Sequence, residues 1–336
     1  MKSKKVQVGI LGCANIAERY AIPAFKKLDN VELVAIASRD KEKASAWAEK
    51  FNLEAESYES LITRTDIEVI YSPLPVGLQE EWAIKAGKAG KHVICEKSIT
   101  YSFDSAKRMV DAFGAKNLAL YENFVPEFHP QHARILSLIA DGSIGEPRVL
   151  RAFYGFPGFP ANDIRLQKKL HGGSLNDCGC YTVFMARKIF DAEPLAVTCS
   201  LSQGVEVDMH GSALLEFPIG TALLGFGFDQ MYQNTYSVWG SKGMVGTKRA
   251  FAIPPDLKPP VELVTNNGKE ERTIAIDVPA ANQFMLSFKY VCDAIARSDT
   301  AEFALMRSRI LQQAKVMEAM RQSAREGKRV KLVSGA

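Results

Sequence analysis

The chain has no apolar run of the roughly 18 residues that a membrane-spanning helix needs, so its sequence predicts no transmembrane segment. Its six cysteines are scattered through apolar stretches, and only Cys178 and Cys180 are close together. A lone C-x-C pair is a weak metal signal, so we expect reduced core thiols in a cytoplasmic protein. The N-terminus is basic and then apolar, but it lacks a small-residue cleavage site and fits a first strand better than a secretory signal.

The chain also has little excess of charge of either sign, since it contains 42 Lys and Arg residues and 38 Asp and Glu residues. The net charge of +4 is not clustered, which argues against a nucleic-acid surface and leaves anionic small molecules open. His129, His132 and His171 have no metal-ligand spacing, so no metal site is expected. The length of 336 residues with 47% hydrophobic composition fits two folded domains.

The first part of the chain alternates short apolar runs with helical patterns. The runs are each too short and too continuously apolar to have one wet face, and they lie at residues 6–11, 31–38, 69–72, 92–95 and 119–121. Helical patterns occur between them, at residues 41–51 and 78–89. This alternation predicts a Rossmann domain over residues 1–122, an α/β fold with a doubly wound parallel sheet.

The second part, residues 123–336, has a different pattern. After a helical segment at 131–141 come strand-like runs at 147–156, 196–202, 210–216, 221–228 and 236–239. Several alternate apolar with small or polar residues, which predicts an α+β domain with a large, mostly antiparallel open sheet. Two closing helices carry apolar stripes that we expect in the core. An apolar sheet face would be covered by another copy, in a homodimer or homotetramer.

A glycine-containing turn follows the first predicted strand. Gly12, Ala14 and Ala17 match the Rossmann pattern, with alanine at two of its three positions. Because a strand precedes this turn and a helical pattern follows it, the context favours a dinucleotide pyrophosphate site. The residues expected there, at the turn and the start of the helix, are Gly12, Cys13, Ala14, Asn15 and Ile16.

The end of the second predicted strand bears on cofactor choice. An NAD-selective site expects a carboxylate there, which would repel a 2′-phosphate. Here Ser38 can donate a hydrogen bond and Arg39 offers a cation, so NADP(H) is preferred and NAD(H) stays possible. The alternative is that Arg39 only begins a solvated helix that Asp40 caps.

The carboxyl ends of parallel strands form the ligand edge of such a sheet. Pro73 and Leu74 follow the third long strand, and Glu96 and Lys97 follow the buried strand at 92–95. These four residues are therefore expected beside the cofactor.

Three segments together resemble a known family. They are GILGCANIAERYAIPAF, YSPLPVGLQEEWAIKAGKAGKHVICEKS and GGSLNDCGCYTVFMAR, in order and at proper spacing, with WGSKGMV and ANQF further on. The family is that of glucose-fructose oxidoreductases, inositol dehydrogenases and related sugar dehydrogenases (Gfo/Idh/MocA). Within it, ENFVPEFHPQH and FYGFPGFPANDIRLQKKLHGGSL are most similar to ketoreductases acting at C3 of nucleotide-linked deoxysugars.

The resemblance implies roles for individual residues. The family's Glu-Lys-Pro motif falls on Glu96, Lys97 and Ser98, and its lysine reaches substrate and nicotinamide. Ser98 replaces the proline and so lacks its fixed φ. The later Asp-x-x-x-His motif falls on Asp177 and Tyr181, with tyrosine in place of histidine.

Three further residues are expected near the cofactor or the substrate. Gln79 stands where relatives often have histidine, and we expect it near the cofactor with an open role. Asn123 is expected to contact the substrate. Arg165 could bind a substrate phosphate or could pair at the surface with Asp163.

The chemistry of the catalytic residues follows from their types. Asp177 and Tyr181 are four apart in a helical pattern, so they share one face. A phenol can bond and protonate the oxygen of a ketone that receives a hydride, and a free tyrosine, with a pKa of about 10, is protonated at neutral pH. Lys97 would stabilise the phenolate left behind. Alternatively, Tyr181 is only a core aromatic, and Asp177 is a helix N-cap.

The expected function is therefore NADPH-dependent reduction of a keto-sugar, in particular a nucleotide-linked 3-keto-deoxysugar, with Tyr181 as proton donor and Lys97 and Asp177 in support. A dehydrogenase of a free sugar, polyol or dihydrodiol is the alternative. A non-catalytic regulator that binds the cofactor is a third possibility, although the sequence retains both the lysine and the proton donor.

Overall fold

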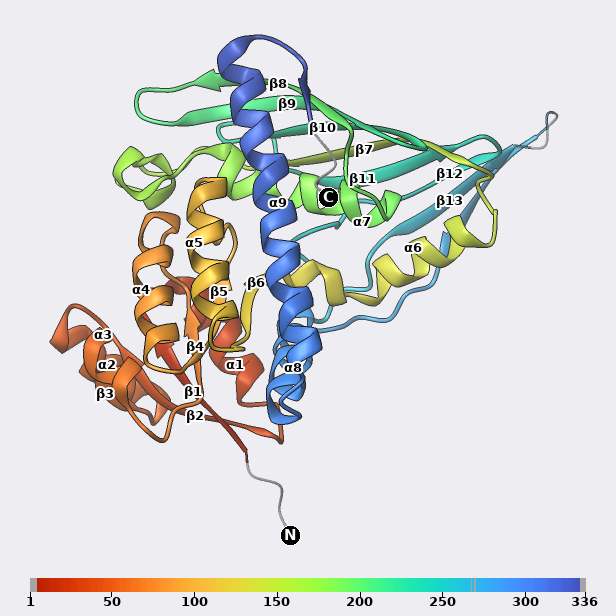
Figure 1. The fold of residues 1–336 in the computed structure, drawn as a ribbon. Coiled ribbons are helices and arrows are strands. Elements are labelled where there is room, and N and C mark those ends of the chain that lie inside the picture. Colours follow the sequence, from red (N-terminus) through yellow and green to blue (C-terminus); the bar gives the residue numbers. More distant parts are fainter. Residues whose placement is uncertain (1–4, 267, 269, 333–336) are drawn as a thin grey trace. The chain divides into compact units, whose positions relative to one another are not determined.

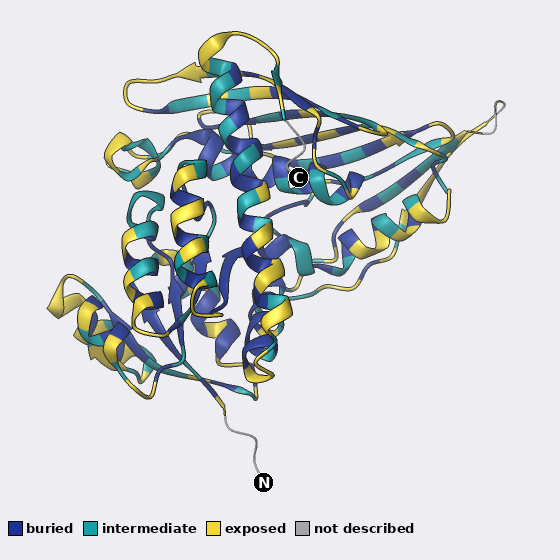
Figure 2. Cartoon of the chain, in the orientation of Figure 1, coloured by how far each residue is buried: buried dark blue, intermediate teal, exposed yellow. Residues whose placement is uncertain are grey.

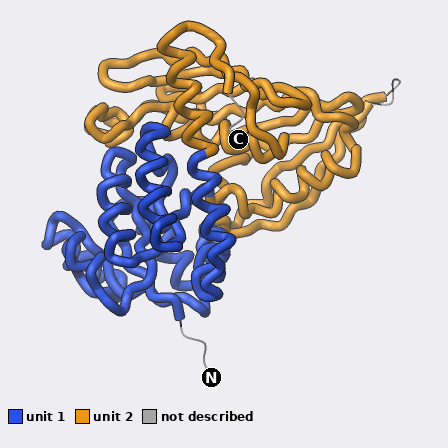
Figure 3. The backbone as a smooth tube through the Cα atoms, in the orientation of Figure 1, with its two compact units in different colours: residues 1–124, 284–311 blue, residues 125–283, 312–336 orange. Residues whose placement is uncertain are grey.

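The computed structural model describes residues 5–266, 268 and 270–332. The chain forms two compact units, shown in Figure 3: residues 1–124 with 284–311, and residues 125–283 with 312–336. Residues 284–311 thus cluster with the first unit, whereas the sequence grouped them with the second part; the domain division at residue 122 itself stays a prediction. Among the described residues, no helix combines the length and apolar character needed to cross a bilayer.

The first unit is built on a six-stranded parallel sheet (Figure 1). Its strands are β1 (Val6–Leu11), β2 (Val31–Ala37), β3 (Glu54–Glu56), β4 (Val69–Ser72), β5 (His92–Glu96) and β6 (Leu120–Asn123), in the order β3-β2-β1-β4-β5-β6. The direction of strand addition reverses between β1 and β4, which is where Rossmann folds bind ligands. The predicted Rossmann fold is confirmed.

Helices cover this sheet on both faces. They are the π-helical turn η1 (Ala17–Ala21), α1 (Ile22–Phe25), α2 (Lys41–Phe51), α3 (Tyr58–Thr63), α4 (Val76–Lys88), α5 (Phe103–Gly114), α8 (Gln283–Ala296) and the first part of α9 (Thr300–Glu326). All four residues of β4 are buried, as are the three central residues of β5, so the inner strands are dark blue in Figure 2. Continuous apolar runs are what a sheet covered on both sides requires.

Helix α8 belongs to the first unit because its aromatic side chains pack there. Phe288 stacks on Phe25, with ring centroids 3.9 Å apart, and meets the edge of Tyr71 at 5.3 Å. Phe284 stacks on Tyr20 at 5.1 Å. Burying large aromatic rings is a strong driving force, and these contacts join a late helix to β4 and to the helical turns η1 and α1 near the start of the chain.

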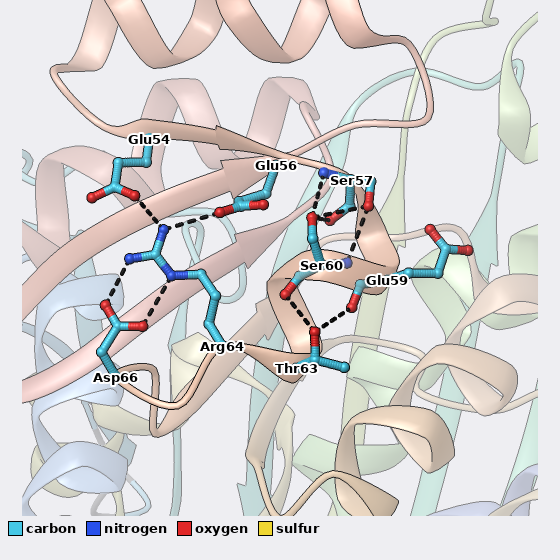
Figure 4. Close-up of polar contacts among 8 residues, drawn as sticks. All are labelled: Glu54, Glu56, Ser57, Glu59, Ser60, Thr63, Arg64 and Asp66. Atoms are coloured by element: carbon cyan, nitrogen blue, oxygen red, sulfur yellow. Dashed lines mark hydrogen bonds and ion pairs between the residues drawn. The ribbon is translucent and has the colours of Figure 1, made fainter.

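The edge of this sheet is held by a cluster of charges (Figure 4). Arg64 Nη1 lies 2.5 Å from Glu54 and 3.1 Å from Glu56, both on edge strand β3, and Arg64 Nη2 lies 2.6 Å from Asp66. The adjoining helix α3 begins with a capping box between Ser57 and Ser60. These contacts fix the start of α3, where Tyr58 lies.

The second unit is built on a nine-stranded sheet. Its strands are β7 (Pro147–Gly155), β8 (Ala196–Gln203), β9 (Asp208–Phe217), β10 (Gly220–Gly227), β11 (Gln233–Gly240), β12 (Gly243–Thr247), β13 (Val261–Asn266), β14 (Glu271–Ile276) and β15 (Val330–Lys331). Their order is β14-β13-β12-β11-β7-β10-β9-β8-β15, and only β7 and β10 pair in parallel. The predicted large, mostly antiparallel sheet is confirmed, although β12 to β15 were not foreseen.

The two faces of this sheet differ. The helical elements of the unit are η2 (Val125–Phe128), α6 (Pro130–Ala140), η3 (Ile164–Leu166), η4 (Lys168–Leu170), η5 (Leu175–Gly179), α7 (Cys180–Phe190) and the last part of α9. The face that α7 covers is buried, with Leu150, Ala152 and Tyr154 from β7. The other face of the central strands exposes Phe153 and Trp239 among polar residues.

Candidate active site

The turn after β1 forms a close approach that only glycine allows. Gly12 has φ of +129°, and a Cβ there would lie 3.1 Å from Leu74 Cδ2, 3.6 Å from Tyr58 Oη and 3.8 Å from Pro73 Cγ. A bound dinucleotide requires backbone without a side chain at this point. The turn, the predicted residues Pro73 and Leu74, and the start of α3 thus lie together and fit the pyrophosphate of a dinucleotide.

The predicted cofactor residues of β1 and β2 also meet. Cys13 Sγ lies 3.9 Å from the carbonyl oxygen of Ala37, the residue before Ser38, and burial raises the pKa of the Cys13 thiol to about 11. All six cysteines are free, and five are buried. Asp40 accepts from Lys43 N at 3.0 Å, so its predicted capping role is confirmed.

Arg39 is exposed, and it lies close enough to Tyr58 for its charge to act on the Tyr58 hydroxyl group. Burial raises the pKa of Tyr58, and the charge of Arg39 opposes that shift. The Tyr58 ring meets Trp82 edge-on at 4.9 Å. Sequence reasoning missed Tyr58; its only signal is that it follows a helix-capping serine near the end of β3.

Gln79 is fully buried and braces the loop after β4. Its Oε1 accepts from Ser72 Oγ at 2.8 Å, and its Nε2 donates to the carbonyl oxygens of Ser72 at 3.1 Å and Leu74 at 2.8 Å. The role of Gln79 was left open, and these three hydrogen bonds show that it stabilises the loop that carries Pro73 and Leu74. Its contact with the cofactor stays a prediction.

A partly buried hydrogen-bond network surrounds the carboxylate of Glu96 at the end of β5. Glu96 Oε1 accepts from Tyr71 Oη at 2.8 Å and from Asn123 Nδ2 at 2.8 Å, and Asn123 Oδ1 accepts from Ser287 Oγ at 2.7 Å. Burial raises the pKa of Glu96, while Asn123, Tyr71 and the charge of Lys97 oppose that shift. Asn123 is fully buried, and its side-chain nitrogen contacts Glu96. The predicted contact of Asn123 with the substrate stays a prediction.

Lys97 is followed by a buried loop. The peptide bond between Lys97 and Ser98 is cis, and Ser98 is buried. The next residue, Ile99, donates its backbone N–H to Glu122 Oε1 at 3.0 Å. The segment that carries Lys97 is therefore fixed at both sides by carboxylates, Glu96 before it and Glu122 after it.

The second unit contains Asp177 and Tyr181 on one helical segment. The segment begins with the π-helical turn η5, and Asp208 on β9 accepts from Ser174 Oγ at 2.8 Å and from Leu175 N at 2.7 Å. Asp177 lies inside this turn, so the alternative that it is the N-cap is wrong: Ser174 occupies that position. π-Helical turns are frequent at functional sites.

Arg165 joins two carboxylates in the second unit. Its Nε donates to Asp177 Oδ2 at 3.1 Å, and its Nη1 lies 3.2 Å from Asp163 Oδ1. The guanidinium also lies over the ring of Phe159, 4.9 Å from its centroid. The surface pairing with Asp163 is thus present, and a second partner, Asp177, was not foreseen.

Tyr181 is held by aromatic packing. Only 9% of the residue is exposed, and its ring meets Tyr154 edge-on at 5.3 Å and Phe251 at 5.7 Å. The carbonyl oxygen of the preceding residue, Cys180, accepts from Gln313 Nε2 at 2.9 Å. Tyr181 is therefore a packed aromatic, and this is compatible with a role for its hydroxyl group.

Two histidines of the second unit, His129 and His132, lie in its core. His132 Nδ1 lies 2.8 Å from Tyr236 Oη, and burial lowers the pKa of His132 to about 3 and that of His129 to about 4, so both are neutral at pH 7. Within the part of the chain that the structure describes, no group of three or more His, Cys, Asp or Glu residues could hold a metal ion.

Comparison with known families agrees with this geometry. Residues 6–124 match the model of the oxidoreductase family with an NAD-binding Rossmann fold, and residues 132–246 match the GFO/IDH/MocA C-terminal domain.

Individual relatives extend along nearly the whole chain. A dTDP-3,4-didehydro-2,6-dideoxy-alpha-D-glucose 3-reductase of Saccharopolyspora spinosa is 35% identical over 96% of this chain and 99% of that protein. The crystal structure of a 3-ketoreductase from Actinomadura kijaniata, in complex with NADP and TDP-benzene, has a TM-score of 0.90 at 33% identity and covers 95% of this chain and 98% of that one. An NADP(+) D-xylose 1-dehydrogenase of Haloferax volcanii is 35% identical over 74% of this chain and 77% of that protein.

Proposed function

Because the chain belongs to the GFO/IDH/MocA family of oxidoreductases, we propose that it is an NADPH-dependent reductase of a nucleotide-linked 3-keto-deoxysugar, of the dTDP-linked class. The observation that carries this proposal is the presence of a lysine directly after β5 and a tyrosine in the first turn of α7, in a chain similar to 3-ketoreductases over nearly its whole length.

The lysine and tyrosine have a parallel in the relative from Actinomadura kijaniata. Structures of that enzyme include one variant with a tyrosine changed to phenylalanine and another with a lysine changed to alanine. Those two positions are as many residues apart as Lys97 and Tyr181 are in this chain. This agreement supports Lys97 and Tyr181 as the catalytic residues.

The proposed chemistry divides the work among three side chains. NADPH, when bound, supplies the hydride for the carbonyl carbon. Tyr181 donates its phenolic proton to the carbonyl oxygen as negative charge develops there. Lys97, as an ammonium ion, stabilises that charge and the phenolate that remains. Asp177 supports the proton donor from the preceding turn of the same helical segment.

The cofactor preference rests on the end of β2. The exposed Arg39 guanidinium and the Ser38 hydroxyl group are suited to a 2′-phosphate, and the nearest carboxylate, Asp40, is engaged as the cap of α2. We therefore assign NADP(H) as the preferred cofactor. The turn residues Gly12 to Ile16, together with Pro73, Leu74, Gln79 and Glu96, complete the proposed cofactor site.

Two side chains, Arg165 and Asn123, are proposed to contact the substrate. A nucleotide-linked sugar carries a diphosphate, and Arg165 is the cation next to Asp177 that could exchange a carboxylate partner for a phosphate oxygen. Asn123 is kept as a proposed substrate contact, although its amide is engaged with Glu96 and Ser287.

Oxidation of a free sugar is the second candidate, because the similar Haloferax volcanii protein is a D-xylose 1-dehydrogenase. It ranks lower, since the relatives similar over 96% of this chain include the dTDP-sugar 3-reductases of two further organisms.

We also propose that the chain forms a homodimer or homotetramer through the open face of the nine-stranded sheet. Phe153, Leu223 and Trp239 are 42%, 42% and 59% exposed, and strand register puts all three on that face. A second copy would bury them.

The six free thiols favour a reducing compartment, so we propose a cytoplasmic location.

The first prediction concerns the reaction. NADPH should be consumed with dTDP-linked 3,4-didehydro-2,6-dideoxyglucose, and NADP⁺ should not be reduced at a comparable rate with D-xylose or a trans-dihydrodiol. Absorbance at the nicotinamide band measures both directions. Faster turnover with a free sugar would favour the dehydrogenase, and NADPH binding without turnover of any ketone would favour a regulator.

The second prediction concerns the proton donor. Tyr181→Phe should lower kcat by about 10² to 10⁴, the range of a general acid, because the phenylalanine ring keeps the packing but has no proton to donate. NADPH affinity, measured by fluorescence titration, should not change. Tyr290→Phe, which removes the hydroxyl bonded to Glu302, serves as the control. Unchanged turnover of Tyr181→Phe would remove Tyr181 from the mechanism.

The third prediction concerns cofactor choice. Arg39→Ala should weaken NADPH binding about tenfold or more, through loss of a charged hydrogen bond, and should leave NADH binding nearly unchanged. Lys41→Ala is a matched control, since Lys41 is an exposed cation at the start of α2. Equal weakening of both cofactors would show that Arg39 does not read the 2′-phosphate.

The fourth prediction concerns assembly. The protein should sediment as a dimer or tetramer, and Trp239→Glu should shift it towards monomer because a carboxylate would have to be buried in the interface. Val205→Glu adds the same charge at a fully exposed loop position and should have no effect. A wild-type monomer at micromolar concentration would contradict the proposal.

A further inference from the structure

The network around Glu96 extends to a residue of helix α8. Ser287 Oγ donates to Asn123 Oδ1 at 2.7 Å and lies 3.4 Å from Tyr121 Oη. Ser287 and Asn123 are both fully buried, so water cannot substitute for either partner. The bond joins residues 164 positions apart in sequence, within the first unit.

The serine hydroxyl fixes the direction of the Asn123 amide. An amide has one accepting and one donating end, and the partner of one end decides where the other points. Because Ser287 occupies the oxygen, the Asn123 Nδ2 group faces Glu96 Oε1 at 2.8 Å. A reversed amide would set its oxygen against a carboxylate oxygen, and these two acceptors would repel.

The neighbouring residue on α8 acts on the second donor to Glu96. Phe288 meets the edge of the Tyr71 ring at 5.3 Å, and Tyr71 Oη donates to the same Oε1 at 2.8 Å. The two side-chain donors, Asn123 and Tyr71, are therefore each contacted by one of two consecutive residues of α8. Ser287 bonds to the Asn123 amide, and Phe288 packs on the Tyr71 ring.

We propose that Ser287 is a positioning residue for the reductase reaction: through Asn123 it orders the Glu96 carboxylate, which in turn orders the adjacent Lys97. This inference rests on the proposed function, because Lys97 is there assigned to the carbonyl oxygen. Ser287 acts through these residues and does not itself contact substrate or cofactor.

A purely structural role would have a different signature. Loss of a buried hydrogen bond lowers stability wherever it occurs. Loss of positioning lowers kcat for a protein that is still folded, leaves substrate KM nearly unchanged, and is reversed by a residue that restores the hydroxyl group.

Three variants separate the two roles. Ser287→Ala removes the hydroxyl and Ser287→Thr restores it. Ser323→Ala is the control, since Ser323 is a fully buried helical serine of the second unit that donates to the carbonyl oxygen of Lys328 at 2.6 Å and accepts from Cys199 N at 2.9 Å. Each is measured below its melting temperature with NADPH and the dTDP-linked 3-keto-sugar named above.

We expect Ser287→Ala to lower kcat about tenfold with KM changed less than about twofold, since small misplacements of a catalytic group are costly. Ser287→Thr should recover most of kcat, and Ser323→Ala should lose stability with kcat intact. A kcat for Ser287→Ala equal to that of wild type, or a loss matched by Ser323→Ala at equal stability, would overturn the proposal.

A readout independent of turnover keeps the two proposals apart. Lys97 can be labelled with a limiting amine-reactive ester and quantified by peptide mass spectrometry, relative to the exposed Lys289. A disordered Glu96 carboxylate supports the Lys97 ammonium less, so labelling of Lys97 in Ser287→Ala should rise about threefold and return to the wild-type rate in Ser287→Thr. Unchanged labelling of Lys97 would contradict the positioning role of Ser287, whether or not the protein reduces a ketone. Failure to reduce any ketone, by itself, would refute only the proposed function.

Discussion

The first unit depends on one constraint, a carboxylate kept at the end of a buried strand. Glu96 follows three fully buried residues of β5, where a charge is costly unless hydrogen bonds compensate for lost water. Tyr71 and Asn123 supply those bonds, and α8 contacts both of them, since Phe288 packs on Tyr71 and Ser287 bonds to Asn123. The late helix that joins the Rossmann unit through its aromatic side chains therefore also supports this carboxylate.

The proposed proton donor, Tyr181 of the second unit, is held in another way. Tyr181 is neutral when protonated, and the rings of Tyr154 and Phe251 pack against it. Charges collect one turn earlier, where Asp177 pairs with Arg165. The proposed reaction needs an ammonium ion that stays charged and a phenol that gives up a proton, and the two kinds of surroundings suit these needs.

Local patterns in the sequence were enough to predict much of this. Continuous apolar runs predicted β1, β4 and β5, the helix at 41–51 was predicted with the bounds that the structure gives it, and the glycine turn was placed by its neighbours in sequence. The short β3 and β14 were missed because they are polar or exposed, and β12 because glycine interrupts it, while β13, whose apolar and polar residues alternate, was also missed. β3 has little apolar content of its own, and both of its glutamates pair with Arg64. The family resemblance supplied roles that no periodicity could.

The supporting residues could not be predicted because their partners are distant in the chain. Ser287 lies in the segment ANQFMLSF, whose apolar spacing predicts only a core helix. Nothing in that pattern indicates which group the serine hydroxyl would bond to. Its meaning depends on which strand the helix covers, and that is decided by the packing of Phe25, Tyr71 and Phe288. The same holds for Asn123, whose amide was expected to face the substrate: once Ser287 occupies its oxygen, the direction of the nitrogen is fixed towards Glu96. A polar side chain at the end of a parallel strand therefore indicates the ligand edge of the sheet, but only its hydrogen-bond partners show whether it contacts a ligand or holds a neighbour that does.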